Sequence, residues 1–479
     1  MSAIIGRKHE IEELERLYQS DRPEFVAVYG RRRVGKTFLI KQALKGRFTF
    51  QHTGVSPVDQ SSDNNRKKTQ LESFYYSLLS HGLEGFQQPK SWMEAFYQLE
   101  QLLIKLDNGN RQVVFIDELP WMDTPRSGFL PAFESFWNGW CSSRDNLMLV
   151  VCGSASSWIL SNLSRSKGGL YGRLTYEIKV SPFNLRECEA FFKHQDILMS
   201  RYDILQAYMV FGGIPYYLSY FQKGYSFEQN TDQILFGQKP RLKEEFDRLF
   251  KAIFENAEDC KKIVRLLATR NYGYTRDEIA AATSLPLGGG LSDTLAALCE
   301  SEFLLRYSPY GKGNGDYYKL TDNFCRFWIK YVDTNQKEAT FMHDNATADI
   351  LSHWRGVAFE QVCWQHFAQI KRALEIGGVK TAVSAWNIPG NDDQPGAQVD
   401  MLIMRDDQIV NLCEMKFCSG LYTIDREEEL RILHRVDRLK ETLQARQKVH
   451  PVLITTYGLT QGKHSGKIQK TIVMDDLFE

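Results

Sequence analysis

The sequence predicts an α/β fold built around a mostly parallel sheet, and three short apolar runs carry this prediction. Phe25 to Tyr29, Val113 to Ile116 and Leu147 to Cys152 are each continuous and apolar, as the buried strands of a parallel sheet are. Segments in which apolar residues recur at helical spacing separate these runs. Strands that alternate with helices are typical of a parallel sheet that is covered by helices on both faces.

The first of these strands is flanked by two predicted helices. Apolar residues recur at helical spacing in residues 7–20, before the strand, and residues 38–45 continue as a helix after it. A glycine lies directly after the strand, where the chain must turn. The polar stretch from Ser56 to Lys68 is expected to be a loop that leads to further helices through about residue 106.

The rest of the chain changes its pattern twice. Residues from about 185 to 250 have a helical pattern, which Gly212-Gly213-Ile214-Pro215 interrupts. Short helices and two strand-like runs follow, in an order that resembles a winged helix. The polar stretch from Asp333 to Thr347 is expected to be a linker, and after it the pattern becomes helix, strand, strand, helix and strand.

Composition and charge exclude several classes of protein. Hydrophobic residues make up 43% of the 479 residues and charged residues 25%, which is usual for folded globular proteins. The 59 basic and 59 acidic residues balance, so no global field favours nucleic acid or an anionic membrane. No apolar window reaches the length of a membrane span, no secretory leader is visible, and the nine cysteines form no CxxC pair. We therefore expect a cytoplasmic protein with reduced thiols and no membrane partner.

One motif between a strand and a helix predicts a phosphate site. The pattern G-x-x-x-x-G-K-[ST] is matched by Gly30-Arg31-Arg32-Arg33-Val34-Gly35-Lys36-Thr37. Its glycines let backbone N–H groups surround phosphate, Lys36 neutralises the β- and γ-phosphates, and the Thr37 hydroxyl ligates Mg²⁺. The sequence therefore predicts a P-loop that binds ATP and Mg²⁺.

Two later strands end in residues that suit the same chemistry. Asp117 and Glu118 close an apolar strand, so Asp117 is predicted to hold Mg²⁺ and Glu118 to orient or deprotonate the attacking water. An acidic helix cap is the alternative interpretation of this pair. Ser154 follows the next strand, where it would contact the γ-phosphate or the water, or would only cap the following turn.

Together these motifs resemble the archaeal-type ATPases of the AAA+/STAND group, over about residues 1–330. The resemblance also includes the opening Ile5-Gly6-Arg7-Lys8-His9-Glu10, Leu170-Tyr171-Gly172-Arg173 and Gly212-Gly213-Ile214-Pro215. It implies that Arg173 is an arginine finger and that Pro215 lies near the nucleotide in a helical lid. A finger supplied by a neighbouring subunit would make hydrolysis depend on a homo-oligomer. The alternatives are a surface ion pair for Arg173 and a helix-breaking turn at Pro215.

The winged-helix segment does not have the composition of a DNA-reading module. Its expected recognition helix, Leu291 to Glu300, contains two acids and no basic residue, whereas readers of the major groove use Arg, Lys, Asn and Gln. Basic residues occur earlier in the segment, so a phosphate-contacting face stays an alternative. We expect a packing or lid role for this segment rather than sequence-specific reading of DNA.

A second group of candidates lies near the carboxy terminus. Glu360 lies on a predicted helix, Asp400 starts an apolar strand, and Glu414-Met415-Lys416 ends the next strand. This order resembles the PD-(D/E)XK nuclease superfamily, with a restriction-endonuclease-like αβββαβ core, although Val399 replaces the usual proline. Carboxylates on adjacent strands of a hairpin converge on a divalent metal, so Glu360, Asp400 and Glu414 are predicted metal ligands. Lys416 would orient water or stabilise the phosphorane.

The predicted protein has four domains and one leading function. The domains are a P-loop ATPase domain (1–184), a helical lid (185–256), a winged helix (257–335) and a PD-(D/E)XK nuclease-like domain (348–479). The leading hypothesis is an ATPase whose nucleotide state controls a metal-dependent nuclease that acts on DNA or RNA. The alternative is a signalling or scaffold switch in which an inactive nuclease-like domain docks partners. A transcription regulator is a third hypothesis, which the acidic recognition helix disfavours.

Overall fold

The computed structural model describes residues 4–56, 63–165, 168–311, 315–335, 338–388, 390, 395–444 and 446–479. The chain folds as two compact units, each assembled from three stretches. The first comprises Met1–Pro182, Asp247–Glu258 and Ala296–Glu302, and the second Phe183–Phe246, Asp259–Leu295 and Phe303–Glu479. The four domains predicted from the sequence are finer than this division and stay a prediction.

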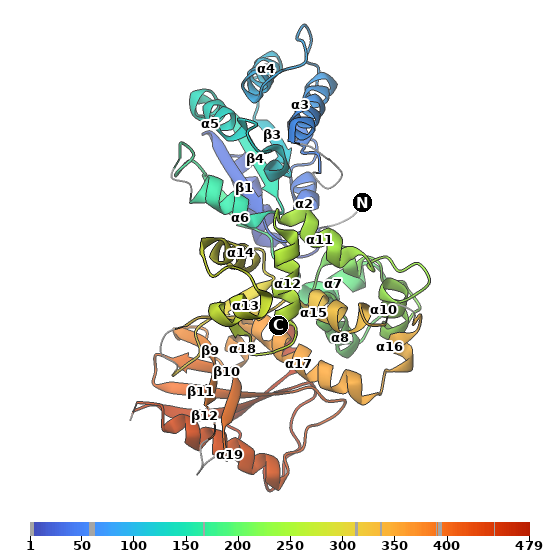
Figure 1. The fold of residues 1–479 in the computed structure, drawn as a ribbon, viewed down its shortest axis with the longest axis vertical. Coiled ribbons are helices and arrows are strands. Elements are labelled where there is room, and N and C mark those ends of the chain that lie inside the picture. Colours follow the sequence, from blue (N-terminus) through green and yellow to red (C-terminus); the bar gives the residue numbers. More distant parts are fainter. Residues whose placement is uncertain are drawn as a thin grey trace. The chain divides into compact units, whose positions relative to one another are not determined.

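The first unit contains a five-stranded parallel sheet with the strand order β2-β3-β4-β1-β5. Figure 1 labels its central strands β1, β3 and β4. The predicted α/β fold with a parallel sheet is therefore confirmed. Sequence reasoning missed β2 and β5, which are the two edge strands. Polar residues interrupt both, so neither reads as a buried apolar run. The strands are β1 (Glu24–Tyr29), β2 (Phe48–Thr53), β3 (Gln112–Asp117), β4 (Leu147–Gly153) and β5 (Tyr176–Lys179).

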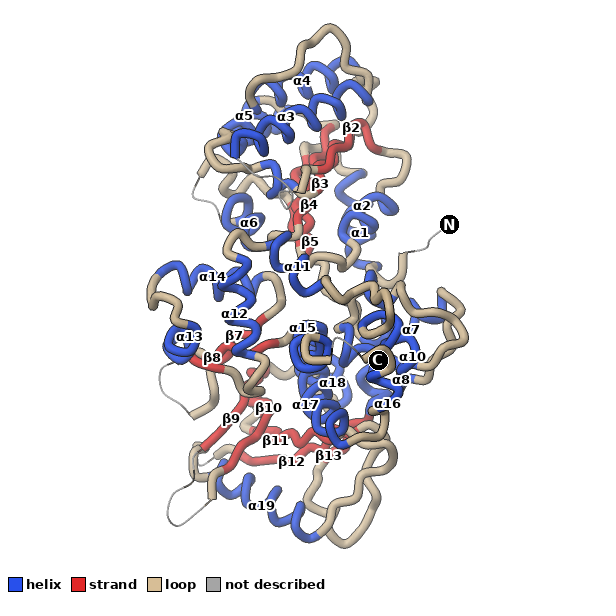
Figure 2. Tube along the Cα trace, turned by 45° about the vertical axis from the view of Figure 1, so that its right-hand side comes forward, coloured by secondary structure: helices blue, strands red, loops and turns tan. Residues whose placement is uncertain are grey.

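Three helices cover one face of this sheet with an aromatic core (Figure 2). Phe74 of α3, Phe96 of α4 and Phe136 of α5 are buried in it, and the rings of Phe96 and Phe136 stack at a centroid distance of 5.0 Å.

The predicted loop at 56–68 was wrong in its second half, because α3 begins at Asp63; residues 57–62 lie outside the described residues. The helices of this unit are α1 (Lys8–Tyr18), α2 (Lys36–Ala43), α3 (Asp63–Ser80), α4 (Trp92–Lys105), α5 (Phe129–Gly139), α6 (Ser156–Ile159), η2 (Leu119–Met122), η3 (Cys141–Ser143) and η4 (Leu160–Ser164).

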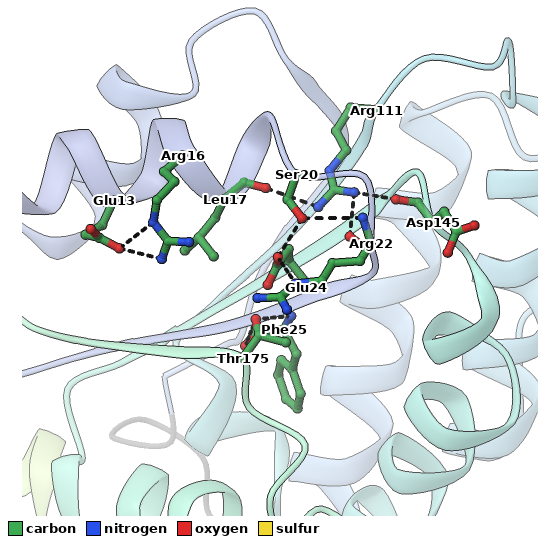
Figure 3. Close-up of polar contacts among 10 residues, drawn as sticks. All are labelled: Glu13, Arg16, Leu17, Ser20, Arg22, Glu24, Phe25, Arg111, Asp145 and Thr175. Carbon is green, nitrogen blue, oxygen red and sulfur yellow. Dashed lines mark hydrogen bonds and ion pairs between the residues drawn. The ribbon is translucent and has the colours of Figure 1, made fainter.

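Polar contacts fix the end of the sheet that is remote from the glycine-rich loop (Figure 3). Glu24, at the start of β1, is fully buried, and its carboxylate accepts hydrogen bonds from Ser20 Oγ at 2.7 Å and from Arg22 Nε at 2.9 Å. The Arg111 guanidinium donates to the backbone carbonyls of Arg22 at 2.8 Å and of Leu17 at 3.2 Å. A buried carboxylate such as that of Glu24 needs hydrogen-bond donors. Together these contacts fix the start of β1, the strand that leads into the glycine-rich loop.

The second unit begins with a helical region. Its predicted helical pattern is observed, but the predicted linker at 333–347 contains a helix, α16, that packs on α10. The Asp232 carboxylate of α10 accepts hydrogen bonds from the backbone N–H groups of Met342 at 2.7 Å and His343 at 3.0 Å. The helices here are α7 (Leu185–His194), α8 (Arg201–Phe211), α9 (Pro215–Leu218), α10 (Phe227–Leu235), α15 (Asn323–Phe327), η5 (Trp328–Val332) and α16 (Phe341–Asp344).

A small sheet and its helices follow the helical region. The three-stranded antiparallel sheet has the order β6-β8-β7, and sequence reasoning missed β6 because this strand has only two residues. Thr275 caps α13 through a reciprocal pair of hydrogen bonds with Glu278. The elements are β6 (Tyr274–Thr275), β7 (Leu304–Tyr307), β8 (Tyr317–Leu320) and α13 (Arg276–Thr283), with α11 (Glu245–Ile253), α12 (Ala257–Leu267) and α14 (Gly289–Glu300) running across the division between the units.

A mixed five-stranded sheet completes the second unit, with the order β13-β12-β11-β10-β9. β9, β10 and β11 are antiparallel to one another, while β11, β12 and β13 are parallel. The helix predicted around Glu360 is followed directly by a second helix, with His366 between the two, and β13 was missed. The elements are α17 (Asp349–Gln365), α18 (Phe367–Ala373), β9 (Thr381–Ile388), β10 (Ala397–Arg405), β11 (Ile409–Lys416), α19 (Arg426–Lys440), β12 (Lys448–Thr455), β13 (Lys470–Val473) and η6 (Met474–Phe478).

All nine cysteines are free thiols, and most are buried. Among the helices that the structure describes, none combines the length and the apolarity that crossing a membrane requires.

Candidate functional site

The loop between β1 and α2 requires glycine at its first position. Gly30 has a φ of 143°, and a Cβ atom there would lie 2.2 Å from the backbone oxygen of Val180. Gly35 has a φ of 93° and directly precedes α2, and Arg33 between them also has a positive φ of 72°. The backbone therefore turns sharply around the loop, as phosphate-binding loops do.

Lys36 is held inside this loop. Only 5% of the residue is exposed. Its Nζ donates hydrogen bonds to the backbone oxygens of Gly30 and Arg31, both at 2.9 Å, and to Ser154 Oγ at 3.1 Å. The ammonium group thus lies between the loop and the end of β4, which is the position predicted for binding phosphate oxygens.

Thr37 and Asp117 meet beside the loop. The Thr37 hydroxyl donates to Asp117 Oδ2 at 2.9 Å, and Asp117 Oδ1 accepts from the backbone N–H of Glu118 at 3.0 Å. Asp117 is 4% exposed and ends β3. A hydroxyl and a carboxylate are hard oxygen ligands, so the pair fits Mg²⁺ by its chemistry and its position at the first turn of α2.

Glu118 is bound by Ser154. Ser154 Oγ donates to Glu118 Oε1 at 2.8 Å, and the Ser154 backbone N–H donates to Oε2 at 3.0 Å. Glu118 has a φ of 47°, and the turn around it is tightly packed. A Cβ atom at Gly54 would lie 2.7 Å from the Glu118 backbone oxygen, and one at Gly153 would lie 2.6 Å from Pro120 Cδ. Sequence reasoning missed Gly54, because the strand that precedes it was not predicted.

The remaining loop residues surround these contacts. Arg31 and Val34 are buried, whereas Arg32 and Arg33 are half-buried. The structure therefore brings together Gly30, Lys36, Thr37, Asp117, Glu118 and Ser154 through direct contacts. The roles predicted for these residues and for the other residues of the loop stay predictions.

Arg173 and Pro215 are not part of this contact group. Arg173 is exposed, and within the described residues its guanidinium makes no hydrogen bond or ion pair. Its backbone N–H donates to the Leu170 carbonyl at 3.1 Å, in a turn. Pro215 is the first residue of α9 in the second unit. Both roles stay predictions.

The carboxy-terminal candidates divide into two pairs. Glu360 of α17 and Asp400 of β10 line one small pocket, together with Lys319 of β8. On β11, by contrast, Glu414 Oε1 accepts from Arg435 Nη1 at 2.7 Å, and Lys416 Nζ lies 2.9 Å from a carboxylate oxygen of Glu428. Both partners belong to α19. Sequence reasoning missed Lys319, Arg435 and Glu428, which lie outside the motif.

The electrostatics of the pocket reflect its crowded charges. Burial raises the pKa of Glu360 to about 8, and the negative charge of Asp400 adds to this effect, while Lys319 and Arg326 oppose it. Burial lowers the pKa of Lys319 to about 8, although Asp400 and Glu360 favour its charged form. Burial and the Arg435 guanidinium act in opposite directions on the pKa of Glu414, which is raised.

The described His, Cys, Asp and Glu side chains form no ready-made metal site. Within the described part of the chain, no group of three or more of them is arranged to hold a metal ion. The donor chemistry of Glu360 and Asp400 suits Mg²⁺ or Mn²⁺, because hard cations prefer carboxylate oxygens. The predicted ligand set therefore stays a prediction.

The fold and the loop contacts give the first unit a parallel sheet whose first strand leads into a loop of phosphate-binding geometry. Residues 4–221 match a protein family described as an ATPase domain predominantly from Archaea. This range contains the loop, Asp117, Glu118 and Ser154. The chain thus carries an archaeal-type ATPase domain, and this match supports ATP as its ligand and ATP hydrolysis as its reaction.

Two proteins of Methanocaldococcus jannaschii are similar in sequence. The uncharacterized protein MJECL04 is 24% identical over 444 residues, which cover 91% of this chain and 92% of that protein. The uncharacterized ATP-binding protein MJ0423 is 46% identical over 44 residues, which cover 9% of this chain and 75% of that protein. The first similarity extends over both units.

Solved structures resemble the chain more distantly. The Walker-type ATPase PABY2304 of Pyrococcus abyssi has a TM-score of 0.46 and 18% identity, and the match covers 68% of this chain and 96% of that one. The ORC2 protein of Aeropyrum pernix, in ADPNP–ADP complexes, has a TM-score of 0.40 and 14% identity, with 69% of this chain and 94% of that one covered. Likenesses at this level carry no conclusion about function.

Proposed function

We propose that the chain binds ATP with Mg²⁺ at Gly30–Thr37, hydrolyses it, and uses the nucleotide state to control its carboxy-terminal region. The observation that carries this proposal is the contact group of Lys36, Thr37, Asp117, Glu118 and Ser154. Three separate segments of chain supply these residues, and all of them meet at one end of the sheet. A cytoplasmic location is part of the proposal.

Each residue has a distinct part in this reaction. Lys36 exchanges its backbone acceptors for β- and γ-phosphate oxygens, and Thr37 and Asp117 hold Mg²⁺, which neutralises phosphate charge when bound. Glu118 orients or deprotonates the attacking water once its carboxylate leaves Ser154, and Ser154 then contacts the γ-phosphate or the water. The backbone amides of the loop, including those of Arg31, Arg32 and Arg33, surround the phosphates.

Arg173 and Pro215 extend the proposed site. The Arg173 guanidinium is exposed and makes no hydrogen bond or ion pair within the described residues, which suits a finger that reaches the γ-phosphate of a neighbouring subunit in a homo-oligomer. The rate of ATP hydrolysis per chain would then rise with protein concentration, and Arg173→Ala would remove this rise. Pro215, at the start of α9, is proposed to lie near the nucleotide.

The test of the ATPase proposal is the rate of ATP hydrolysis by Lys36→Ala beside Lys41→Ala. Both changes remove one lysine from α2, but Lys41 is exposed and belongs to no contact of the loop. We expect Lys36→Ala to abolish ATP binding and hydrolysis and Lys41→Ala to retain both. Equal hydrolysis by the two variants would contradict the proposal.

A second proposal concerns the carboxy-terminal region as a metal-dependent nuclease that acts on DNA or RNA. It is favoured by the order α17, β9, β10, β11, α19 and β12, which suits the restriction-endonuclease-like αβββαβ core, and by the joint pocket of Glu360 and Asp400. Residues 257–335 are proposed to be a winged helix, since α12, α13 and α14 precede β7 and β8. The boundaries of the four predicted domains remain part of this proposal.

The contacts of β11 also suit the rival function, a switch that only docks partners. Glu414 and Lys416 are paired with Arg435 and Glu428, so neither is free to act on a substrate in this arrangement. The two functions are separated by phosphodiester cleavage with Mg²⁺ or Mn²⁺, on DNA and RNA, beside Glu414→Ala. Cleavage that Glu414→Ala abolishes while ATP hydrolysis continues supports the nuclease; no cleavage with intact ATP hydrolysis supports the docking switch.

A further inference from the structure

Lys319 extends from the three-stranded sheet toward the carboxy-terminal sheet. It lies in β8, where it pairs with Leu305 of β7, and only 8% of the residue is exposed. Its Nζ lies 4.7 Å from the centre of the Trp364 ring, on α17. The same indole donates its Nε1–H to the backbone oxygen of Asp400 at 3.1 Å. Trp364 therefore contacts both the Lys319 ammonium group and the backbone of β10.

Lys319 carries its ammonium group on a buried side chain. Among the described residues it donates no hydrogen bond and makes no ion pair. It lines the same pocket as Glu360 and Asp400, and Tyr307, Tyr317 and Trp386 form the walls. A buried ammonium group is expensive unless negative charge compensates for it. The Asp400 carboxylate supplies that charge, and Glu360 adds to it when it is ionised; both favour the charged form of Lys319.

A divalent cation would have to use the same two carboxylates. It would bind their oxygens at roughly 2.0–2.6 Å, and so lie close to the ammonium group in a poorly hydrated pocket. Two positive charges repel each other strongly where water does not screen them. Lys319 and a divalent cation therefore compete for one negatively charged place.

We propose that Lys319 is the internal counter-cation of Glu360 and Asp400, so that the three-stranded sheet keeps this pair from binding a divalent cation until β8 moves away. This inference rests on the proposed role of Glu360 and Asp400 as metal ligands. It adds a residue outside the motif, and a sheet outside the αβββαβ core, to the control of that site.

The first test is equilibrium dialysis of the full chain against Mn²⁺, without nucleotide. Lys319→Met removes the ammonium group and keeps an unbranched apolar side chain of similar reach. Arg306→Met is the matched control, because it removes an exposed cation from the neighbouring strand β7. We expect the dissociation constant for Mn²⁺ to fall by about 10- to 100-fold in Lys319→Met, and to stay unchanged in Arg306→Met. Adding Glu360→Gln to Lys319→Met should abolish the gain.

A second measurement uses the wild-type chain and does not depend on the folding of a variant. If Mn²⁺ displaces Lys319, saturating Mn²⁺ should increase hydrogen exchange of the backbone amides in β8, residues 317–320. Bound Mn²⁺ that depends on Glu360 but leaves the exchange of β8 unchanged would overturn the inference.

The outcomes separate this inference from the proposal on which it rests. If the wild type already binds Mn²⁺ as tightly as Lys319→Met, and Glu360→Gln abolishes the binding in both, the metal site stands and the role of Lys319 is wrong. If neither chain binds Mn²⁺ in a Glu360-dependent manner, the metal-ligand role fails and the inference fails with it. Thermal unfolding of the same samples, followed by circular dichroism, shows whether each variant is folded.

Discussion

The two groups of candidate residues differ in what their side chains bind. In the first unit, Lys36 binds the loop and Ser154, and Thr37 binds Asp117, so the predicted residues are one another's partners. In the second unit, Glu414 binds Arg435, which no motif includes. A motif whose members bind each other is assembled as a site. When the members of a motif bind residues of other elements instead, those pairings must break before the motif can bind a metal or a substrate.

The physical reason for this difference lies in the backbone. Parallel strands end at one edge of the sheet, so β1, β3 and β4 bring their terminal residues together without help from other elements. The acids of the carboxy-terminal region come from one helix and two antiparallel strands. Lys319 of β8 lines the pocket of Glu360 and Asp400, whereas α19 supplies the partners of Glu414 and Lys416. Four predictions, in order of decreasing expected effect, test whether the two groups of residues differ in this way.

The largest effect is expected for Glu118→Gln. The amide keeps the size of the side chain but removes the base, so kcat for ATP hydrolysis should fall by about 10²- to 10⁴-fold. The dissociation constant for ATP should change little, because Lys36 and Thr37 remain. Single-turnover hydrolysis and fluorescent-nucleotide binding measure the two quantities. A variant that hydrolyses ATP at the wild-type rate would remove Glu118 from the mechanism.

Gly30→Ala tests whether the loop backbone is the rigid part of the first site. The added Cβ would lie 2.2 Å from the Val180 oxygen, so the free energy of unfolding should fall by about 2–4 kcal/mol. Gly46→Ala is the control, because Gly46 has a positive φ of 77° but open space around its Cβ position. It should lose only about 1 kcal/mol in urea unfolding. Equal losses would show that crowding at Val180 does not matter.

Arg435→Met tests the pairing that occupies the second site. It leaves the Glu414 carboxylate, in a residue that is 8% exposed, without its partner, and should lower the free energy of unfolding by about 1–3 kcal/mol. Lys440→Met, which breaks an exposed pair on the same helix, should have little effect. If the two variants are equally stable in thermal unfolding, the Arg435 pair does not hold Glu414.

Glu360→Gln should change how stability depends on pH. The pKa of Glu360 is raised in the folded chain to about 8 from an ordinary value of 4.5, so the folded state favours the protonated form. The stability that this group contributes is present below pH 4.5 and is lost as the pH rises toward 8. Relative to the wild type, Glu360→Gln should gain about 1–2 kcal/mol between pH 5.5 and 8. Parallel stability curves would mean that Glu360 titrates normally.

Sequence reasoning found what is contiguous in the chain. The P-loop, the Asp117-Glu118 pair and the central strands are short runs whose pattern is local, and the structure confirms the parallel sheet that they predicted. The edge strands β2 and β5 were missed because polar residues interrupt them. The two residues of β6 are too few to form a pattern at all.

The partners of the second site could not be predicted from local patterns. Lys319 lies between apolar residues in a short strand and meets Glu360 and Asp400 only after the chain has folded back. Arg435 and Glu428 belong to α19, a highly charged helix whose pattern is that of a solvated surface. The ion-pair partners of such residues depend on the tertiary structure, because sequence spacing does not show which face of a charged helix packs on a sheet.

The most direct test of the comparison is the amount of Mn²⁺ bound per chain, measured by electron paramagnetic resonance with and without ATP. At a Mn²⁺ concentration well below the level that saturates the chain without nucleotide, we predict one Mn²⁺ per wild-type chain that appears only with ATP, that Asp117→Asn removes and that Asp400→Asn leaves unchanged. Mn²⁺ that binds without ATP, is lost in Asp400→Asn and is retained in Asp117→Asn would contradict the account, because the second site would then be the assembled one.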